Sequence, residues 1–205
     1  AHDHLDDGLA RARVVRVGKI LKDVQVRARE HRLERGGQVV VLDDVTHAAK
    51  LFQLVQQHNI EVVELVPVAL QLLMEHVRQL PPAQRELPAL RWMMATGEAV
   101  SVDLVNDWLA LYPQIPVVNA YGPTEAADDV IQCAIHQPLP PTQKTVPIGR
   151  PLPNLQVYIL DRQLRLLPPG VAGEICIGGV AFFRRGSYSD TVGLDKCKLC
   201  PGGRY

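Results

Sequence analysis

The central part of the chain alternates short apolar runs with longer stretches in which apolar residues recur every three or four positions. The short runs predict buried strands, and the longer stretches predict amphipathic helices. This alternation is typical of βαβ units, in which helices cover a largely parallel sheet. We therefore predict an α/β fold with strands at 39–42, 60–66, 90–95 and 115–120 and helices at 46–58, 70–80 and 101–111.

The last of these helices has a clear start. Ser101 is expected to cap it, because a serine oxygen can accept a hydrogen bond from a backbone N–H of the first turn. Its inward face is predicted to consist of Leu104, Val105, Trp108 and Leu111.

The pattern changes after residue 137, where prolines and glycines become frequent. Short strands are predicted at 155–160 and 174–177, separated by turn residues such as Pro168-Pro169-Gly170. We therefore predict an α/β subdomain over 37–137 and a small β subdomain that starts at 138 and reaches 180.

Composition narrows the class of protein. The chain has 205 residues, of which 47% are hydrophobic, and no apolar run approaches the about 20 residues that a membrane-spanning helix needs. The N-terminus lacks the layout of a signal peptide, and four cysteines are too few for a disulfide scaffold. We expect no membrane association and a reducing, cytoplasmic location.

Charge is unevenly distributed along the chain, although its 22 Lys and Arg residues balance its 22 Asp and Glu residues. Residues 1–36 carry nine basic and six acidic residues. Residues 37–180 carry eight basic and fourteen acidic residues, and residues 181–205 carry five basic and two acidic residues. The basic residues near the N-terminus are not interleaved with aromatic ones, and no nucleic-acid-reading motif accompanies them. We expect no nucleic-acid partner.

One segment has the residue types of a nucleotide site. Tyr121-Gly122-Pro123-Thr124-Glu125 follows the predicted strand 115–120, where an open α/β sheet binds ligands. A tyrosine ring can stack on a purine, a threonine hydroxyl can contact a phosphate, and a carboxylate can hold Mg²⁺. The alternative is a simple turn between strand and helix.

The same segment resembles a known family. Residues 118–125 read V-N-A-Y-G-P-T-E, similar to the NAYGPTE motif of adenylation domains in nonribosomal peptide synthetases, which are acyl-adenylate-forming enzymes. Residues 90–99, 147–151 and 173–179 resemble, in the family's order, its strand with a G-E-A loop, its PIGRP segment and its GELxIGG segment. The resemblance covers roughly residues 37 to 180.

The resemblance implies a fold, a reaction and partners. The fold would be the parallel-sheet part of the large N-terminal adenylate-forming subdomain, which binds nucleotide and substrate, followed by the start of a β-barrel-like subdomain. The reaction would activate an amino acid with ATP and Mg²⁺ to an aminoacyl-AMP, within secondary-metabolite biosynthesis. The acyl group would pass to phosphopantetheine on a peptidyl carrier domain, with condensation domains as further partners.

The resemblance also implies site residues by motif position. Thr124 and Glu125 would be catalytic, with Thr124 contacting the α-phosphate and Glu125 holding Mg²⁺. The nucleotide-binding residues would be Gly97, Glu98, Asn119, Ala120, Tyr121, Gly122 and Thr124. The residues that line the amino-acid pocket would be Glu64, Met94, Thr96, Ala120, Asp128 and Asp129. Three carboxylates in the pocket would favour a cationic substrate side chain. The alternative is that Glu64 or Asp128 faces solvent or a structural partner.

Several segments of the family are missing, which predicts a fragment truncated at both ends. There is no Gly/Ser/Thr-rich phosphate loop ending in Lys and no aromatic-Asp segment, and the domain with the catalytic Lys would lie beyond Tyr205. The isolated chain is therefore expected to be inactive. Residues 1–36 and 181–205 stay unassigned, with locally shifted reading frames and divergence as the two explanations.

Two other functions remain open. An acyl-CoA or aryl-acid ligase of the same superfamily shares the Tyr-Gly-x-Thr-Glu core, although Asn119-Ala120 and Pro123 favour the peptide synthetase. A nucleotide-binding or interaction fragment without catalytic activity is the other alternative, favoured by the missing phosphate loop.

Glu125 can be tested in the intact protein that carries this chain, called the parent below. Glu125→Gln should chiefly impair Mg²⁺-dependent turnover, because it removes a charge from the metal site and keeps the shape of the side chain. The measurement is the turnover rate over a Mg²⁺ titration. An unchanged rate with an unchanged Mg²⁺ dependence would remove Glu125 from the site.

Overall fold

The computed structural model describes residues 47–123, 126 and 129–179 with their side chains, and the strands at 13–17, 29–32 and 38–42 by their backbone. The chain divides into two compact units. Unit 1 comprises residues 1–119 and 134–147, and unit 2 comprises residues 120–133 and 148–205. The predicted subdomain boundaries at residues 37, 137 and 180 stay predictions.

Unit 1 contains a mostly parallel sheet, as predicted. Its strands follow the order β2-β3-β1-β4-β5-β6. The pairs β1–β3, β1–β4, β4–β5 and β5–β6 are parallel, and β2–β3 is antiparallel. The strands are β1 (Arg13–Val17), β2 (Arg29–Arg32), β3 (Gln38–Leu42), β4 (Val62–Leu65), β5 (Trp92–Ala95) and β6 (Val117–Tyr121), whose last two residues belong to unit 2.

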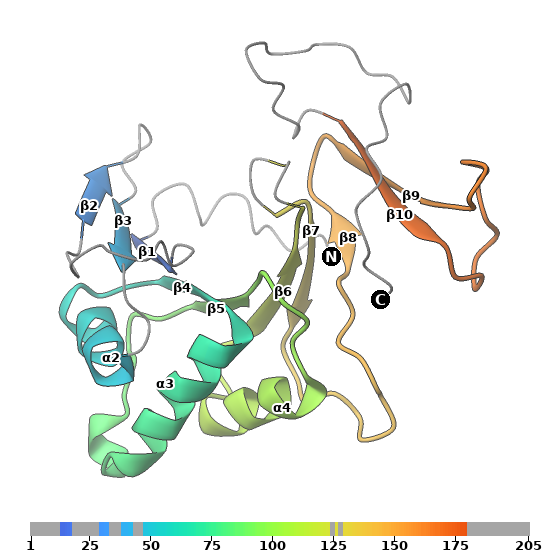
Figure 1. The fold of residues 1–205 in the computed structure, drawn as a ribbon. Helices are drawn as coiled ribbons and strands as arrows, with labels where there is room; N and C mark the ends of the chain where they lie inside the picture. Colours follow the sequence, from blue (N-terminus) through green and yellow to red (C-terminus); the bar gives the residue numbers. More distant parts are fainter. Residues whose placement is uncertain are drawn as a thin grey trace. The chain divides into compact units, whose positions relative to one another are not determined.

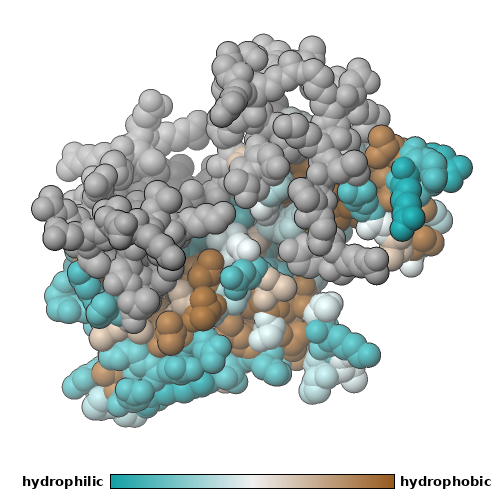
Figure 2. All heavy atoms as spheres, in the orientation of Figure 1, coloured by the Kyte–Doolittle hydropathy of each residue, from teal (hydrophilic) through white to brown (hydrophobic). Residues whose placement is uncertain are grey.

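Three helices lie on one side of strands β4 and β5 (Figure 1). They are α2 (Ala48–Gln57), α3 (Pro67–Gln79) and α4 (Val102–Leu111), with a short 3₁₀ helix, η1 (Pro82–Gln84), after α3. Each buries one apolar stripe against the sheet, as amphipathic helices do. Figure 2 shows that the lower edge of the view, which these helices form, is mainly hydrophilic. The fully buried large side chains of unit 1 are Leu51, Ile60, Leu65, Leu70, Leu73, Met74, Met93, Trp108 and Ile115.

The largest buried side chain is also fully hydrogen-bonded. Trp108 donates its indole N–H to the carbonyl oxygen of Ile115 at 2.9 Å. Its ring lies 4.7 Å from that of Tyr112, and the Tyr112 hydroxyl donates to the carbonyl oxygen of Arg85 at 2.8 Å. Burial raises the pKa of Tyr112 to about 12. These bonds therefore tie the end of α4 to Ile115, just before β6, and to Arg85, just after η1.

The observed inward face of α4 differs in part from the prediction. Val105 and Trp108 are buried as expected, but Leu109 is buried in place of Leu104 and Leu111, which are half-buried. Positions 105, 108 and 109 lie on one face of a helix with 3.6 residues per turn, and 104 and 111 flank it. Ser101 caps the helix as predicted, since its hydroxyl accepts from the Leu104 N–H at 3.2 Å.

The unassigned residues 1–36 contain two of the strands, β1 and β2. The sequence signal for β1 was the run Val14-Val15, because β-branched residues favour strands. Residues 180–205, which include the whole of the other unassigned segment, lie outside the described residues.

The described residues of unit 2 form two antiparallel strand pairs. Strand β7 (Ile131–Ile135), whose last two residues belong to unit 1, pairs with β8 (Arg150–Pro151). Strand β9 (Leu155–Leu160) pairs with β10 (Glu174–Gly179), so both predicted short strands are confirmed. A hydrophobic cluster is made of Ala126, Val130 and Ile131, with Tyr121, Ile148, Leu155, Val157, Ile175 and Ile177 packed against it.

The cap of α4 gives a stability prediction. Ser101→Ala should lower the free energy of unfolding of the parent domain by about 1 kcal/mol, because the Leu104 N–H loses its acceptor. Urea unfolding measures the change, and Ser101→Asp is the matched control because aspartate can accept the same bond. Equal stability of the alanine and aspartate variants would contradict the capping role.

Candidate functional site

The carboxyl ends of β4, β5 and β6 bring six of the predicted site residues into one region of unit 1. Glu64 of β4 pairs in register with Met94 of β5, and Ala95 of β5 pairs with Asn119 of β6. Because all three strands are parallel, the residues that follow them lie at the same edge of the sheet. That edge carries Glu64, Met94, Thr96, Gly97, Glu98 and Asn119.

Glu64 is a buried carboxylate in a strand that is otherwise apolar. Its side chain is 6% exposed, and the neighbouring Val63 and Leu65 are buried as well. Glu64 therefore does not face solvent. A buried carboxylate of this kind needs a charge or hydrogen-bond partner.

The Thr96-Gly97-Glu98 loop continues from β5 at the same edge. The Thr96 N–H donates to the carbonyl oxygen of Leu65 at 3.0 Å, which holds the start of the loop beside β4. Gly97 has a φ of +82°, and a Cβ there would lie 3.3 Å from Cγ1 of Val66. Gly97 and Glu98 are exposed, so a ligand can approach the backbone of this loop closely.

Asn119 is the other buried polar residue among those described with side chains, at 5% exposure. Its amide nitrogen Nδ2 donates to the carbonyl oxygen of Pro147 at 3.0 Å. This bond fixes the orientation of the amide and ties β6 to the segment that begins at Pro147. No local sequence pattern predicts this role, because residues 119 and 147 are far apart in the chain.

In unit 2, the described part of the predicted nucleotide segment is held by backbone bonds. The Val130 N–H donates to the carbonyl oxygen of Tyr121 at 2.8 Å, and the Ala126 N–H donates to that of Pro123 at 3.0 Å. Ala120 is buried, and Tyr121 and Gly122 are half-buried. Tyr121 also packs against the hydrophobic cluster of unit 2. Backbone bonds thus hold the described residues Tyr121 and Pro123, and the tyrosine is partly accessible.

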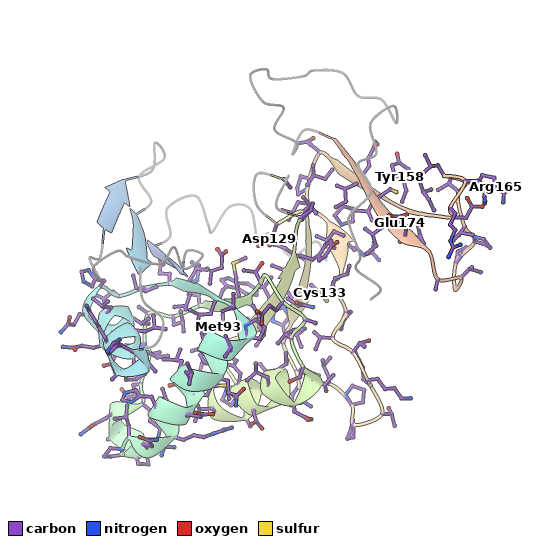
Figure 3. All side chains as sticks on the ribbon, in the orientation of Figure 1. Met93, Asp129, Cys133, Tyr158, Arg165 and Glu174 are labelled. Atoms are coloured by element: carbon purple, nitrogen blue, oxygen red, sulfur yellow. The ribbon has the colours of Figure 1, made fainter. Side chains whose placement is uncertain are left out.

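Some predicted site residues lie outside the described residues. These are Thr124, Glu125 and Asp128. Asp129 is described and half-buried, with a buried Oδ2, and lies beside the start of β7 (Figure 3).

Metal-ligand clusters and the thiol of β7 are two further candidates for chemistry in the described part of the chain. No group of three or more His, Cys, Asp or Glu residues is placed to hold a metal ion there. Burial raises the pKa of the Cys133 thiol in β7, so this thiol stays protonated and is a poor nucleophile near neutral pH. Nor is any helix in the described ranges both long and apolar enough to cross a membrane.

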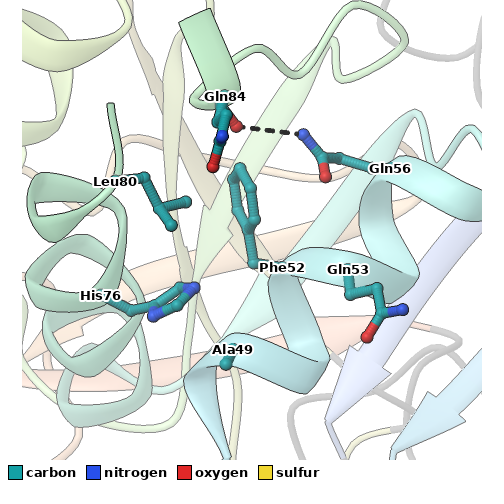
Figure 4. A pocket seen from close by; sticks show the side chains of 7 residues that line it. All are labelled: Ala49, Phe52, Gln53, Gln56, His76, Leu80 and Gln84. Atoms are coloured by element: carbon teal, nitrogen blue, oxygen red, sulfur yellow. Dashed lines mark hydrogen bonds between the residues drawn. The ribbon is translucent and has the colours of Figure 1, made fainter. Parts of the chain in front are cut away.

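A shallow pocket lies between α2 and α3 (Figure 4). Gln56 of α2 closes one side of it by donating to the carbonyl oxygen of Gln84 at 3.3 Å. Its lining residues are Ala49, Phe52, Gln53, Gln56, His76, Leu80 and Gln84. None of the predicted site residues that the structure describes lines this pocket, and its lining residues include no carboxylate and no amine.

Comparisons with known proteins point to one family. Residues 32–185 match the family described as AMP-binding enzyme. Tyrocidine synthase 2 from Brevibacillus parabrevis is 38% identical over 148 residues, which is 70% of this chain and 4% of that protein. Phosphinothricin tripeptide synthetase PhsB from Streptomyces viridochromogenes is 44% identical over 96 residues, which is 47% of this chain and 8% of that protein. The chain therefore spans less than a tenth of these curated relatives.

A solved structure agrees in fold and sequence. The nonribosomal peptide synthetase FmoA3, in a form bound to α-methyl-L-serine-AMP, matches with a TM-score of 0.64 and 26% identity, covering 76% of this chain and 17% of that one. Its AMPPNP-bound form matches in fold, with a TM-score of 0.69 over 90% of this chain and 20% of that one at 23% identity.

The Asn119–Pro147 bond can be tested by a charge change. Asn119→Asp should destabilise the parent domain by about 1–3 kcal/mol, because a carboxylate cannot donate to the Pro147 carbonyl. Burial beside a carbonyl should raise the folded-state pKa of the new acid above about 3.9. The deficit should therefore be full above the folded-state pKa and shrink as pH falls below it, when the acid can donate an O–H.

Urea unfolding of wild type and variant between pH 4 and pH 8 measures this difference. A deficit that is the same at every pH would show that the donor bond is not what Asn119 contributes.

Proposed function

The chain belongs to the family of AMP-binding enzymes, and we propose that it acts as part of an adenylation domain in a nonribosomal peptide synthetase. One observation carries the proposal. Six residues that the family motifs assign to nucleotide or substrate lie together at the carboxyl ends of β4, β5 and β6. Ligands bind at this edge in open α/β sheets.

The proposed reaction has two steps. A carboxylate oxygen of the amino acid attacks the α-phosphorus of ATP, a new O–P bond forms, and the bond to the β-phosphate oxygen breaks to release pyrophosphate. A carrier-domain phosphopantetheine thiol then attacks the acyl carbon, and AMP leaves. Such chemistry depends on positioning and on neutralisation of charge, so the protein does not need a covalent intermediate.

The residues of this chain would mainly bind and orient. Tyr121 presents a half-buried aromatic ring that can stack on the adenine. The exposed backbone of Gly97 and Glu98 offers donors and acceptors at the edge of the sheet. Asn119, whose Nδ2 is bonded to Pro147, would present its Oδ1 as an acceptor for the adenine amino group. Thr124 would contact the α-phosphate.

The proposal includes cofactor and partners. Mg²⁺, when bound through Glu125, would offset the negative charge of the phosphates. Peptidyl carrier and condensation domains of the parent would receive the product and extend the peptide, in the cytoplasm.

The buried carboxylate of Glu64 suggests the class of amino acid. It pairs in register with Met94, and both stand at the proposed pocket positions. A cationic side chain such as that of ornithine, lysine or arginine would form a favourable charge pair with this carboxylate, which an apolar side chain cannot form. We therefore propose a basic amino acid as the substrate. Asp128 and Asp129 are the other two carboxylates that the family motifs assign to the substrate.

Two alternatives give different experimental results. An acyl-CoA or aryl-acid ligase would use a carboxylic acid without an α-amino group, and a non-catalytic module would bind nucleotide without turnover. The synthetase is favoured by Asn119-Ala120 and Pro123 and by the similarity to tyrocidine synthase 2.

Pyrophosphate exchange into ATP by the parent tests both parts of the proposal. Exchange should require an amino acid and should be fastest with ornithine, lysine or arginine. Glu64→Gln should reduce the preference for these over leucine by about 10-fold or more, because one charge pair in a dry pocket decides most of it. Exchange that fatty or aryl acids stimulate and amino acids do not would support the ligase. A clear preference of the wild type for leucine, valine or phenylalanine would show that Glu64 does not face the substrate.

A further inference from the structure

The segment from Pro147 to Leu152 has no role in the proposed reaction, although its first five residues are one of the four family-like motifs. It is half-buried or exposed along its length. Its contacts with the rest of the chain are nevertheless specific at both ends and in the middle. We call residues 147–152 the brace.

The first contact of the brace lies in unit 1. The carbonyl oxygen of Pro147 accepts the Nδ2 donor of Asn119, and both residues are the last of unit 1 before the chain passes into unit 2. Ala120 and Tyr121 follow Asn119 directly. The bond therefore joins the start of the brace to the residue that lies two positions before Tyr121.

The second contact lies in unit 2 and reaches Tyr121 through one intermediate residue. The Leu152 N–H donates to the carbonyl oxygen of Val130 at 2.9 Å, and the Val130 N–H donates to the carbonyl oxygen of Tyr121 at 2.8 Å. Between these points Arg150 pairs with Gln132 in antiparallel register. The far end of the brace is thus linked to Tyr121 by two consecutive backbone hydrogen bonds.

The middle of the brace lies against β7 without space for a side chain. Gly149 has a φ of +90°, and a Cβ there would overlap the carbonyl oxygen of Gln132 and lie 2.7 Å from Cβ of Cys133. These neighbours are backbone or the first side-chain atom, so they cannot rotate away. The neighbouring Ile148 packs against the same hydrophobic cluster as Tyr121. Any residue larger than glycine must push the brace off β7.

From these contacts we infer that the brace is a positioning element for Tyr121 and that Gly149 sets its distance from β7. The brace touches neither nucleotide nor substrate in this scheme. It fixes the backbone of Tyr121 through Val130 and the hydrophobic cluster of unit 2. It also holds Asn119, which lies two residues before Tyr121. The functional part of this inference rests on the proposed function, since Tyr121 is proposed to stack on adenine.

Gly149→Ala in the parent tests the inference against a matched control. The control is Gly173→Ala, in which the new Cβ would lie 2.6 Å from the carbonyl oxygen of Leu160, also in unit 2 but near the far end of the β9–β10 pair. Both changes create a collision with a backbone carbonyl, but only Gly149 lies in the brace.

Gly149→Ala should lower the pyrophosphate-exchange rate about 100-fold, the order expected when a binding group is misplaced by about 1 Å. Its Kd for ATP, measured by calorimetry below the melting temperature, should rise about 10-fold. Gly173→Ala should stay within about twofold of wild type in both. Equal losses in the two variants, or an unchanged Kd in Gly149→Ala, would overturn the inference.

Hydrogen exchange in the wild-type parent supplies a readout that does not depend on the variants folding. Saturation with ATP should slow exchange of the Leu152 amide together with that of Val130, because both bonds lie in the chain that ends at Tyr121. Protection that rises at Val130 and is unchanged at Leu152 would overturn the role of the brace. ATP binding with this protection but without amino-acid-dependent exchange would support the brace and contradict the proposed function.

Discussion

Parallel hydrogen bonding between β4, β5 and β6 is the interaction on which the candidate site depends. A shift of one residue in either pairing would turn every side chain of the moved strand to the opposite face. Buried side chains on these strands, including Val63, Met93 and Val117, make such a shift costly. The same register brings Glu64, Met94 and Asn119 to one edge. The apolar core and the polar edge are therefore consequences of one alignment.

Amide side chains hold the irregular segment between Leu139 and Pro147 against the helices and strands of unit 1. Asn106 of α4 donates to the carbonyl oxygen of Leu139 at 3.0 Å and accepts from the Leu139 N–H at 2.7 Å, as a neighbouring strand would. Trp92 lies edge-on to His136, with ring centres 5.7 Å apart. Asn119 then holds Pro147 at the end of the same segment. Each bond satisfies backbone groups that have no partner within a helix or sheet.

The sequence predicted what local patterns determine. Hydrophobic periodicity predicted the helices and the strand at 155–160, and the hydroxyl of Ser101 predicted the cap. The alternation of strands with helices predicted the parallel sheet. It could not predict bonds between distant residues, such as Asn119 with Pro147, because nothing local encodes them. It could not explain Gly149 either, since the need for glycine arises only where the segment meets Gln132. Burial of Glu64 depends on its neighbours in the sheet and not on its own position in the chain.

A crystal structure of the parent with a non-hydrolysable ATP analogue tests the central claim, that the segment around Tyr121 at the end of β6 binds the nucleotide. The adenine ring is expected to stack on Tyr121, with the Asn119 amide still bonded through Nδ2 to the Pro147 carbonyl. A nucleotide bound elsewhere, for example in the pocket between α2 and α3, with no contact to Tyr121, would contradict the claim.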